Sequence, residues 1–195
     1  TWKNGVWKGG TWKNGVWAKG YWQKGVWDKG TWHEGIWYGG EWKDGEWKTG
    51  IWHDGEWFNG IWKDGTWFKG KWHNGVHERG TWDRGEWVNG EWVGGSWHNG
   101  TWHNGMWRNG SWFNGAWRDG TWWGGSWRDG TWFNGSWLDG EWEDGHWRGG
   151  VWDRGIWKKG WIYDPEKKGN FKEDWKWDKS GYVKSPISPK EYWRK

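Results

Sequence analysis

The chain contains no cysteine, a single methionine (Met106) and only three prolines among its 195 residues. The absence of cysteine excludes both a disulfide framework and a thiolate metal site. No apolar run approaches the length of a membrane-spanning helix, because glycine or a charged residue interrupts the sequence every few positions. We therefore expect a protein that has no disulfides and no membrane partner.

An excess of one charge is also lacking over most of the chain. Residues 1 to 160 carry 20 Lys and Arg against 19 Asp and Glu, and residues 161 to 195 carry nine against six. A protein that binds nucleic acid through phosphate contacts needs a dense positive stripe, and a nucleic-acid mimic needs a dense negative one. The near-neutral balance predicts that nucleic acid is not a partner.

Tryptophan and glycine, by contrast, are present far above normal usage, with 36 Trp and 39 Gly. Residues 1 to 160 divide into 32 pentads that end in Gly, and Trp is the second residue in 31 of them, with His77 as the exception. The fourth residue is Asn, Asp or Gly in 22 pentads, and such a residue before Gly is typical of a sharp turn with positive φ. Each pentad thus predicts one short extended segment and one corner.

The pattern of polar residues indicates which side of each segment faces inward. Alternate residues of an extended segment share a side, so Trp at position 2 faces away from the residue at position 1. Position 1 includes Glu41, Lys71 and Glu91, which cannot line a core without partners. Trp is therefore the predicted interior residue. The predicted core includes Trp2, Trp7, Trp12, Trp52, Trp92, Trp132 and Trp157.

A single pentad is too small to fold alone. Burying one indole, at roughly 200 Å² and about 25 cal/mol per Å², contributes on the order of 5 kcal/mol as an upper bound. Ordering five backbone residues costs roughly 5 to 10 kcal/mol. Stability must therefore come from stacking, which predicts an all-β, single-stranded β-solenoid with layered Trp rings.

The coil length is predicted from similarity at position 3, the residue after Trp. Identical residues four pentads apart occur in six of 28 pairs, but three pentads apart in only one of 29. A 20-residue coil forms columns such as His33, His53 and His73, and Arg108, Arg128 and Arg148. This spacing predicts a four-sided tube of about eight coils. Three-sided and two-sided coils stay open as alternatives that break those columns.

The array resembles the pentapeptide-repeat proteins, in which a large central residue and a small residue two positions earlier both point inward. The stretch GTWKN at residues 10 to 14 supplies that pair as Gly and Trp. The resemblance implies a right-handed quadrilateral β-helix over residues 1 to 160. Repeats of the form xWxxG are also similar to segments of large tailed-phage proteins.

The repeat ends after Gly160, where the register breaks and Pro165, Pro186 and Pro189 mark places at which a ladder should stop. A bare solenoid end exposes backbone groups and a layer of Trp. Residues 161 to 195 are therefore predicted to form an irregular C-terminal cap. Its covering aromatic residues are Trp161, Tyr163, Trp175 and Trp177.

The N-terminal side has no comparable segment. The chain begins at Thr1 and shows no apolar secretion signal, which predicts a cleaved product or a fragment of a larger protein. The first coil is expected to stack on a missing segment, on another copy or on solvent. The predicted partners are accordingly protein: the rest of a larger chain or assembly, or a second copy through the N-terminal coil.

Candidate chemistry is sparse. A column of His33, His53 and His73 would bring imidazoles close together, but no carboxylate completes a metal site at a recognisable spacing. Glu86 and Glu91 lie on adjacent faces of a tube that offers no cleft for paired carboxylates. His77 is interpreted as a tolerated substitution in the core. We expect no enzymatic activity, metal or cofactor.

Exposed aromatic residues are the remaining candidates. Phe113 and Phe133 form one predicted column, Trp123 lies on another face, and Tyr38 and Phe58 form a further pair. Such faces bind glycans or a partner protein, or they stabilise the sheet as ladders. The sequence predicts a structural rod or display module in a larger assembly, such as a phage virion or an extracellular surface structure. The alternative is a carbohydrate- or protein-binding module.

Overall fold

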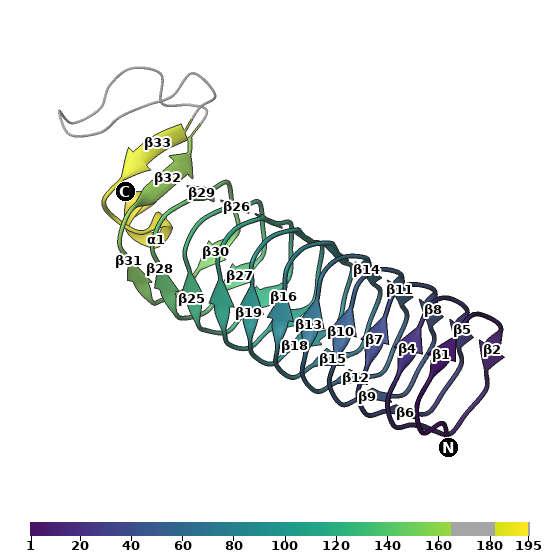
Figure 1. Cartoon of the computed structure of the whole chain (residues 1–195). Coiled ribbons are helices and arrows are strands. Elements are labelled where there is room, and N and C mark those ends of the chain that lie inside the picture. Colours follow the sequence, from purple (N-terminus) through teal and green to yellow (C-terminus); the bar gives the residue numbers. More distant parts are fainter. Residues whose placement is uncertain (165–181, 195) are drawn as a thin grey trace.

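The computed structural model describes residues 1–164 and 182–194. The repeats form an extended rod, with the N-terminus at one end and the C-terminal segment at the other (Figure 1). Positions 1 and 2 of each pentad form a two-residue strand in nearly every repeat, and the intervening residues form the corners. The predicted all-β solenoid with a Trp-filled core is confirmed.

The register of the strands defines the coil. Val6 pairs with Tyr21 and Trp7 with Trp22 in parallel, so each strand pairs with the strand three pentads further along. The strands assemble into three sheets, which form the three faces of the tube. The predicted four-sided tube, with four pentads per coil and about eight coils, is therefore wrong, and the three-sided alternative describes the fold. The array makes about ten coils of three pentads each.

Face one is the 11-stranded sheet. It consists of β1 (Val6–Trp7), β4 (Tyr21–Trp22), β7 (Ile36–Trp37), β10 (Ile51–Trp52), β13 (Thr66–Trp67), β16 (Thr81–Trp82), β19 (Ser96–Trp97), β22 (Ser111–Trp112), β25 (Ser126–Trp127), β28 (Glu141–Trp142) and β31 (Ile156–Trp157). Face two is the 12-stranded sheet. It consists of β2 (Thr11–Trp12), β5 (Val26–Trp27), β8 (Glu41–Trp42), β11 (Glu56–Trp57), β14 (Lys71–Trp72), β17 (Glu86–Trp87), β20 (Thr101–Trp102), β23 (Ala116–Trp117), β26 (Thr131–Trp132), β29 (His146–Trp147), β32 (Gly160–Tyr163) and β33 (Tyr182–Ser185). Face three is the 10-stranded sheet. It consists of β3 (Val16–Trp17), β6 (Thr31–Trp32), β9 (Glu46–Trp47), β12 (Ile61–Trp62), β15 (Val76–His77), β18 (Glu91–Trp92), β21 (Met106–Trp107), β24 (Thr121–Trp122), β27 (Ser136–Trp137) and β30 (Val151–Trp152).

Backbone hydrogen bonds join each coil to the next on every face. The N–H of Val26 donates to the carbonyl oxygen of Gly10 at 2.9 Å, and the N–H of Asp28 donates to that of Trp12 at 2.8 Å. The same two bonds recur throughout the array. Because these bonds run along the rod, each coil is stabilised by its neighbours, as in other solenoids.

The corners require glycine for two separate reasons. At Gly75 the backbone has φ of +119°, a conformation that is strained for residues with a side chain. A Cβ at this position would also lie 2.4 Å from the carbonyl oxygen of Gly60 in the preceding coil. The regular spacing of glycine thus permits both the turn and the close approach of successive coils.

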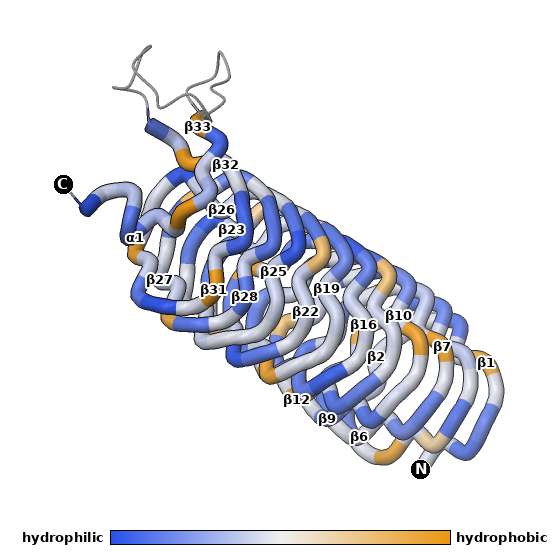
Figure 2. Tube along the Cα trace, turned by 90° about the vertical axis from the view of Figure 1, so that its left-hand side faces the viewer, coloured by the Kyte–Doolittle hydropathy of each residue, from blue (hydrophilic) through white to orange (hydrophobic). Residues whose placement is uncertain are grey.

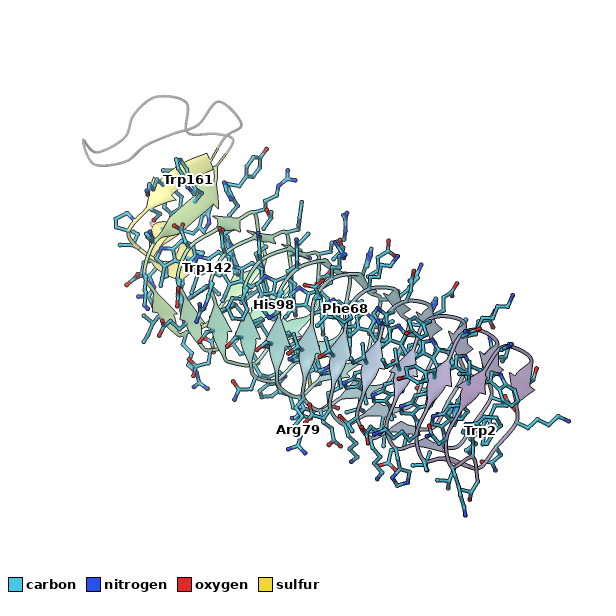
Figure 3. The ribbon with its side chains drawn as sticks, viewed as in Figure 1. Trp2, Phe68, Arg79, His98, Trp142 and Trp161 are labelled. Atoms are coloured by element: carbon cyan, nitrogen blue, oxygen red, sulfur yellow. The ribbon has the colours of Figure 1, made fainter. Side chains whose placement is uncertain are left out.

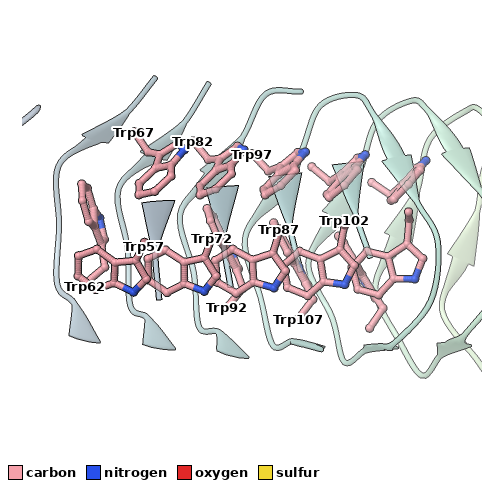
Figure 4. Packing of buried hydrophobic residues seen from close by; sticks show 14 of the residues in the cluster. Trp57, Trp62, Trp67, Trp72, Trp82, Trp87, Trp92, Trp97, Trp102 and Trp107 are labelled. Atoms are coloured by element: carbon pink, nitrogen blue, oxygen red, sulfur yellow. The ribbon is translucent and has the colours of Figure 1, made fainter. Parts of the chain in front are cut away.

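The interior is an array of indoles in three columns, one of which contains His77 in place of Trp (Figure 4). Trp57 and Trp72, which follow one another in a column, have parallel rings with centroids 4.8 Å apart and planes at 6°. Trp67 and Trp72, which belong to adjacent faces of the same coil, meet edge to face at 5.9 Å and 70°. Both geometries are favourable for aromatic rings. Side chains from Trp17 to Trp142 at the core positions are fully buried.

The indole N–H groups of the core have no hydrogen-bond acceptor among the described residues for the whole series from Trp2 to Trp142. The edge-to-face packing within each coil places the edge of one indole against the π face of the next. Trp2, Trp7, Trp12 and Trp157 are only partly buried, since each ends a column and has a stacking neighbour on one side only.

The C-terminal end is closed by a β-hairpin and a short helix. Strand β32 continues face two, but its register pairs His146 with Trp161 and Trp147 with Ile162. Ile162 therefore takes the core position, where it is fully buried together with Val183 of the antiparallel strand β33. The indole Nε1–H of Trp157 donates to the carbonyl oxygen of Ser185 at 3.0 Å.

Helix α1 (Pro189–Tyr192) begins with a capping box, in which the Ser188 hydroxyl accepts from the Glu191 N–H. It is anchored by Lys190, whose ammonium group donates to the carbonyl oxygen of Asp153 at 2.5 Å. The Tyr192 hydroxyl donates to Asp164 at 2.9 Å, and burial together with this carboxylate raises the pKa of Tyr192.

Of the aromatic residues predicted to cover this end, Trp161 and Tyr163 face outward instead. Trp161 is on the outer side of the hairpin, where its ring stacks on His146 at 6.2 Å (Figure 3). The Tyr163 ring meets the guanidinium of Arg148 at 5.0 Å. Trp175 and Trp177 lie outside the described residues. The aliphatic side chains of Ile162 and Val183 cover the end of the core instead. The register pairs Ile162, and not Trp161, with the core residue Trp147, so Trp161 faces outward.

Candidate functional sites on the solenoid surface

The side chains after Trp form columns at a spacing of three pentads, so the columns predicted at a spacing of four pentads are not formed. His33 follows β6 on face three, His53 follows β10 on face one, and His73 follows β14 on face two. Arg108, Arg128 and Arg148 are divided among the three faces in the same way. The predicted histidine column is therefore wrong, and the three imidazoles point away from one another.

Rings on the surface stack along the rod in short ladders. On face one, Tyr38, His53 and Phe68 have ring centroids 5.1 Å apart at each step, with planes at 3° and 8°. On face two, Phe58 stacks on His73 at 4.6 Å, and the Lys43 ammonium lies 3.8 Å from the Phe58 centroid. The predicted pair of Tyr38 and Phe58 is thus divided between two faces. The stacked rings cover one another's faces within each ladder, whereas Tyr38 and Phe68, at the two ends of their ladder, have a ring neighbour on one side only.

Phe113 and Phe133, predicted to share a column, also lie on different faces. Phe113 on face one is covered by His98, with centroids 4.7 Å apart, and by the Arg128 guanidinium at 4.5 Å. Phe133 on face two has the guanidinium groups of Arg118 and Arg148 at 5.6 and 5.4 Å. Stacked rings and cations stabilise the surface of the solenoid, and they occupy the ring faces that a ligand would need.

Trp123 differs from these residues. It lies on face three after β24, and 49% of its surface is exposed. Its column neighbours are Arg108 and Leu138, and no ring contact involves its indole among the described residues. Trp123 is thus the only one of the five predicted binding residues whose ring takes no part in such a stack.

Charged residues at position 4 form ion pairs between successive coils. Lys19 with Glu34, Lys69 with Asp54 and Arg79 with Asp64 have N–O distances of 3.2, 2.8 and 3.2 Å. Figure 3 shows Arg79 directed outward from the ribbon. These pairs are solvent-exposed and each contributes at most about 1 kcal/mol. Opposite charges three pentads apart at position 4 are a sequence signal for the true coil length, which the search for identical residues at position 3 does not detect.

His77 occupies a core position on β15 and is completely buried. Its ring lies 3.8 Å from the Trp92 centroid but 6.1 Å from that of Trp62, so it is displaced toward one neighbour in its column. Neither ring nitrogen has a hydrogen-bond partner among the described residues. Desolvation lowers the pKa of His77 to about 3, so the imidazole is neutral at physiological pH.

The packing around His77 is looser than elsewhere in the core. Successive core residues from Trp2 to Trp157 meet edge to face in every coil, except that His77 makes no such contact with Trp82. The imidazole lacks the benzo ring that would reach that neighbour. The substitution predicted to be tolerated is therefore accommodated with a local loss of contact.

Shallow grooves follow the corners of the tube, with corner glycines as their floor. The corner between faces one and two holds a groove of about 670 Å³ beside Tyr38 and Lys71. Two grooves of about 580 and 500 Å³ adjoin at Asn59 and Val76, on the corner between faces two and three. A fourth, of about 380 Å³, lies between faces three and one beside Tyr21. These volumes are within the range of ligand-binding clefts.

Other site types are not seen in the described part of the chain. Residues 1–164 and 182–194 contain no group of three or more His, Asp or Glu arranged to hold a metal ion. Over the same residues, no helix has the length and apolar character needed to cross a membrane.

Comparisons with known proteins do not assign a family. No family profile and no curated protein matches the chain. Among solved structures, a chain from Desulfovibrio desulfuricans G20 described as a putative acetyltransferase aligns with 77% of this chain and 68% of its own length, at 3% identity and a TM-score of 0.15. This similarity is too low to bear on fold or function, so the candidate sites depend on the geometry alone.

Proposed function

We propose that the chain is a rigid, non-enzymatic rod or display module within a larger assembly, such as a phage virion or an extracellular surface structure. The observation that supports this proposal is the stack of core indoles that runs along the rod from the first coil to the last, with His77 as its one interruption among the described residues. Bending would have to separate stacked rings and break backbone bonds on one face. A tube of this kind holds its two ends at a fixed distance.

The repeated surface also suits a display role. Each coil offers nine outward positions on three faces at the same spacing, and their identity varies from coil to coil while the core remains constant. The five-residue period with a large inward residue is shared with the pentapeptide-repeat proteins, which the sequence resembles, although this coil has three sides instead of four. The resemblance to xWxxG segments of tailed-phage proteins motivates the virion as one setting.

The partner of the rod is proposed to be protein, contacted in part through the N-terminal coil. In this coil Trp2, Trp7 and Trp12 are partly exposed, and the strand β1 has a paired neighbour on one side only within the described residues. Such an edge is a template for stacking a further coil or strand. Either a segment of the assembly or a second copy of the chain satisfies this requirement.

Rigidity is tested by distances between spin labels, for which the absence of native cysteine is an advantage. Lys13→Cys and Arg118→Cys place labels on face two, after β2 and β23, which are seven strand spacings apart. We expect a single narrow distribution centred at about 34 Å, at ~4.8 Å per spacing. The pair Lys13→Cys and Arg148→Cys, nine spacings apart, should give about 43 Å with the same width.

A broad distribution, or a width that grows with separation, would show a flexible array and would refute the rod. Electron micrographs provide the complementary test of assembly. Particles joined at their N-terminal ends or end to end would support stacking of two copies through the first coil. Monodisperse single rods would exclude self-stacking and leave a different protein as the proposed partner of that coil.

The binding-module alternative needs an aromatic ring with uncovered faces. Phe113, Phe133 and Phe58 do not meet this requirement, because rings or cations lie on both sides of each ring. Tyr38 is stacked on one side only, by His53, and Trp123 takes part in no stack, so these two predicted residues are the remaining candidates for the alternative. The double substitution of Phe113 and Phe133 by Ala is thus expected to leave any glycan binding unchanged.

A further inference from the structure

Tyr21 is an exposed aromatic residue that belongs to no ladder. It is at position 1 of β4 on face one, with 47% of its surface exposed. No ring or cation contact involves its side chain among the described residues. Its column neighbours are aliphatic, Val6 before it and Ile36 and Ile51 after it. Figure 2 shows these apolar positions close together at β1, β7 and β10.

This residue borders the most enclosed of the corner grooves. The groove has a volume of about 380 Å³ and runs along the corner between faces three and one. Tyr21, Ile36 and Ile51 form its apolar wall, and Asn4, Lys19 and Glu34 form its polar wall. Binding clefts for small molecules combine a mainly apolar lining with a few convergent polar groups in this manner.

The polar wall supplies both donors and acceptors without net charge. Lys19 and Glu34 form an ion pair at 3.2 Å, so that neither charge is free to select an ion of opposite sign. Asn4 accepts the Gly5 N–H at 2.8 Å through Oδ1, which directs its amide group over the corner. A ligand here meets an aromatic ring on one side and carboxylate, ammonium and amide groups on the other.

We propose that this groove binds a neutral saccharide whose hydroxyl groups are equatorial. In such a sugar the axial C–H bonds form an apolar face, which would stack on the Tyr21 ring. The hydroxyl groups at the rim would exchange hydrogen bonds with Asn4, Lys19 and Glu34. An apolar protein segment is the weaker fit, because it would displace water from the Lys19–Glu34 pair and the Asn4 amide without offering them hydrogen bonds in return.

The site goes beyond the proposed rod, which requires no ligand, and it adds a ligand-binding function at a defined place. It also differs from the aromatic ladders, because the ring that would carry the contact is the one at position 1. The proposed rod and the proposed sugar site can be refuted independently, because the distances between spin labels test the rod and the binding of oligosaccharides tests the groove.

The test measures binding of cellohexaose and chitohexaose to the whole chain by isothermal titration and by ligand-observed NMR. The variant Tyr21→Thr removes the ring and introduces the residue that the chain itself has at the same position in Thr66 and Thr81. The matched control is Tyr38→His, which changes an equally exposed tyrosine within a ladder.

We expect saturable binding of at least one of the two oligosaccharides by the native chain. Tyr21→Thr should weaken this binding by about tenfold, which corresponds to about 1.4 kcal/mol and lies within the range of aromatic contacts. Tyr38→His should leave the affinity within about twofold of the native value. Glu34→Gln, which keeps the shape of the polar wall and releases Lys19, should weaken binding by a smaller factor.

Three outcomes would overturn the proposal. The first is the absence of binding of both oligosaccharides, and the second is binding that Tyr21→Thr leaves unchanged. The third is uptake of the apolar dye 8-anilinonaphthalene-1-sulfonate, abolished by Tyr21→Thr, without any sugar binding, which would identify an apolar protein contact instead. Circular dichroism of each variant establishes that the solenoid is folded.

Discussion

The interior and the surface of the solenoid follow opposite rules of stacking. Inside, each Trp lies on another Trp one coil away, as Trp57 lies on Trp72. Outside, a residue often lies on a partner of different chemistry, such as Arg79 on Asp64 or Arg128 on Phe113. An indole is compatible with an identical neighbour because parallel rings attract, whereas two like charges at the same spacing repel.

This difference shows that the stability of the fold depends on the core positions, whereas the amino-acid sequence varies mainly at the surface positions. The core positions cannot change without loss of stacked contacts, so the repeat keeps Trp through nearly every coil. The surface positions need only be compatible with the coils before and after them. The following predictions test this division, from the largest expected effect to the smallest.

Removing an indole should have very different consequences inside and outside. Trp92→Ala deletes a fully buried ring that stacks on His77 and Trp107, and we expect a loss of about 3 to 5 kcal/mol in the free energy of unfolding. Trp123→Ala deletes a half-exposed ring and should change stability by less than about 0.5 kcal/mol. Chemical denaturation of both variants measures the two values. Similar values for the two would contradict the division between core and surface.

Glycine at position 5 and glycine at position 4, which occurs in five pentads, should also respond differently to an added methyl group. Gly75→Ala adds a Cβ at 2.4 Å from a backbone oxygen, at φ of +119°, and should cost more than about 2 kcal/mol. Gly94 occupies position 4, has an ordinary φ, and an added Cβ would lie 3.5 Å from the Glu78 carbonyl oxygen. Gly94→Ala should be within about 0.5 kcal/mol of the native chain in thermal or denaturant unfolding. A tolerated Gly75→Ala would mean that the coils are further apart than the register requires.

The pH dependence of stability should reveal the one imidazole in the core. His77 has a pKa of about 3 when folded and its ordinary value of 6.5 when unfolded, so the unfolded chain binds the additional proton between these values. Stability contributed by this residue is complete above pH 6.5 and falls as the pH decreases toward 3, by up to about 1.4 kcal/mol per pH unit.

The control for this effect is His77→Trp, which restores the repeat and removes the titrating group. The difference in unfolding free energy between the two proteins, measured at several pH values, isolates His77 from the surface residues that both share. We expect the variant to be more stable at neutral pH because it regains the missing contact with Trp82, and its advantage should grow on acidification. A difference that is constant from pH 6.5 to 4 would show that His77 is hydrated in the folded chain.

Several features of the fold were accessible from the sequence and several were not. The inward direction of Trp followed from the charged residues at position 1, such as Glu41 and Lys71. The corners followed from the pairs that end in glycine. The coil length did not follow from identity, because surface neighbours such as Lys19 and Glu34 are complementary rather than identical. The groove beside Tyr21 was missed as a consequence, because it joins residues three pentads apart that a coil of four pentads places on different faces.

The sequence by itself determined the local geometry: a two-residue strand, a glycine corner and an inward indole in each pentad. Local preferences of this kind act within five residues and therefore repeat identically along the chain. The number of pentads in a turn was decided only by the tertiary structure, since it depends on how three bulky indoles meet edge to face around one axis and fill it without a gap. That closure set the register of three pentads, and through it the ladders, the ion pairs and the grooves of the surface.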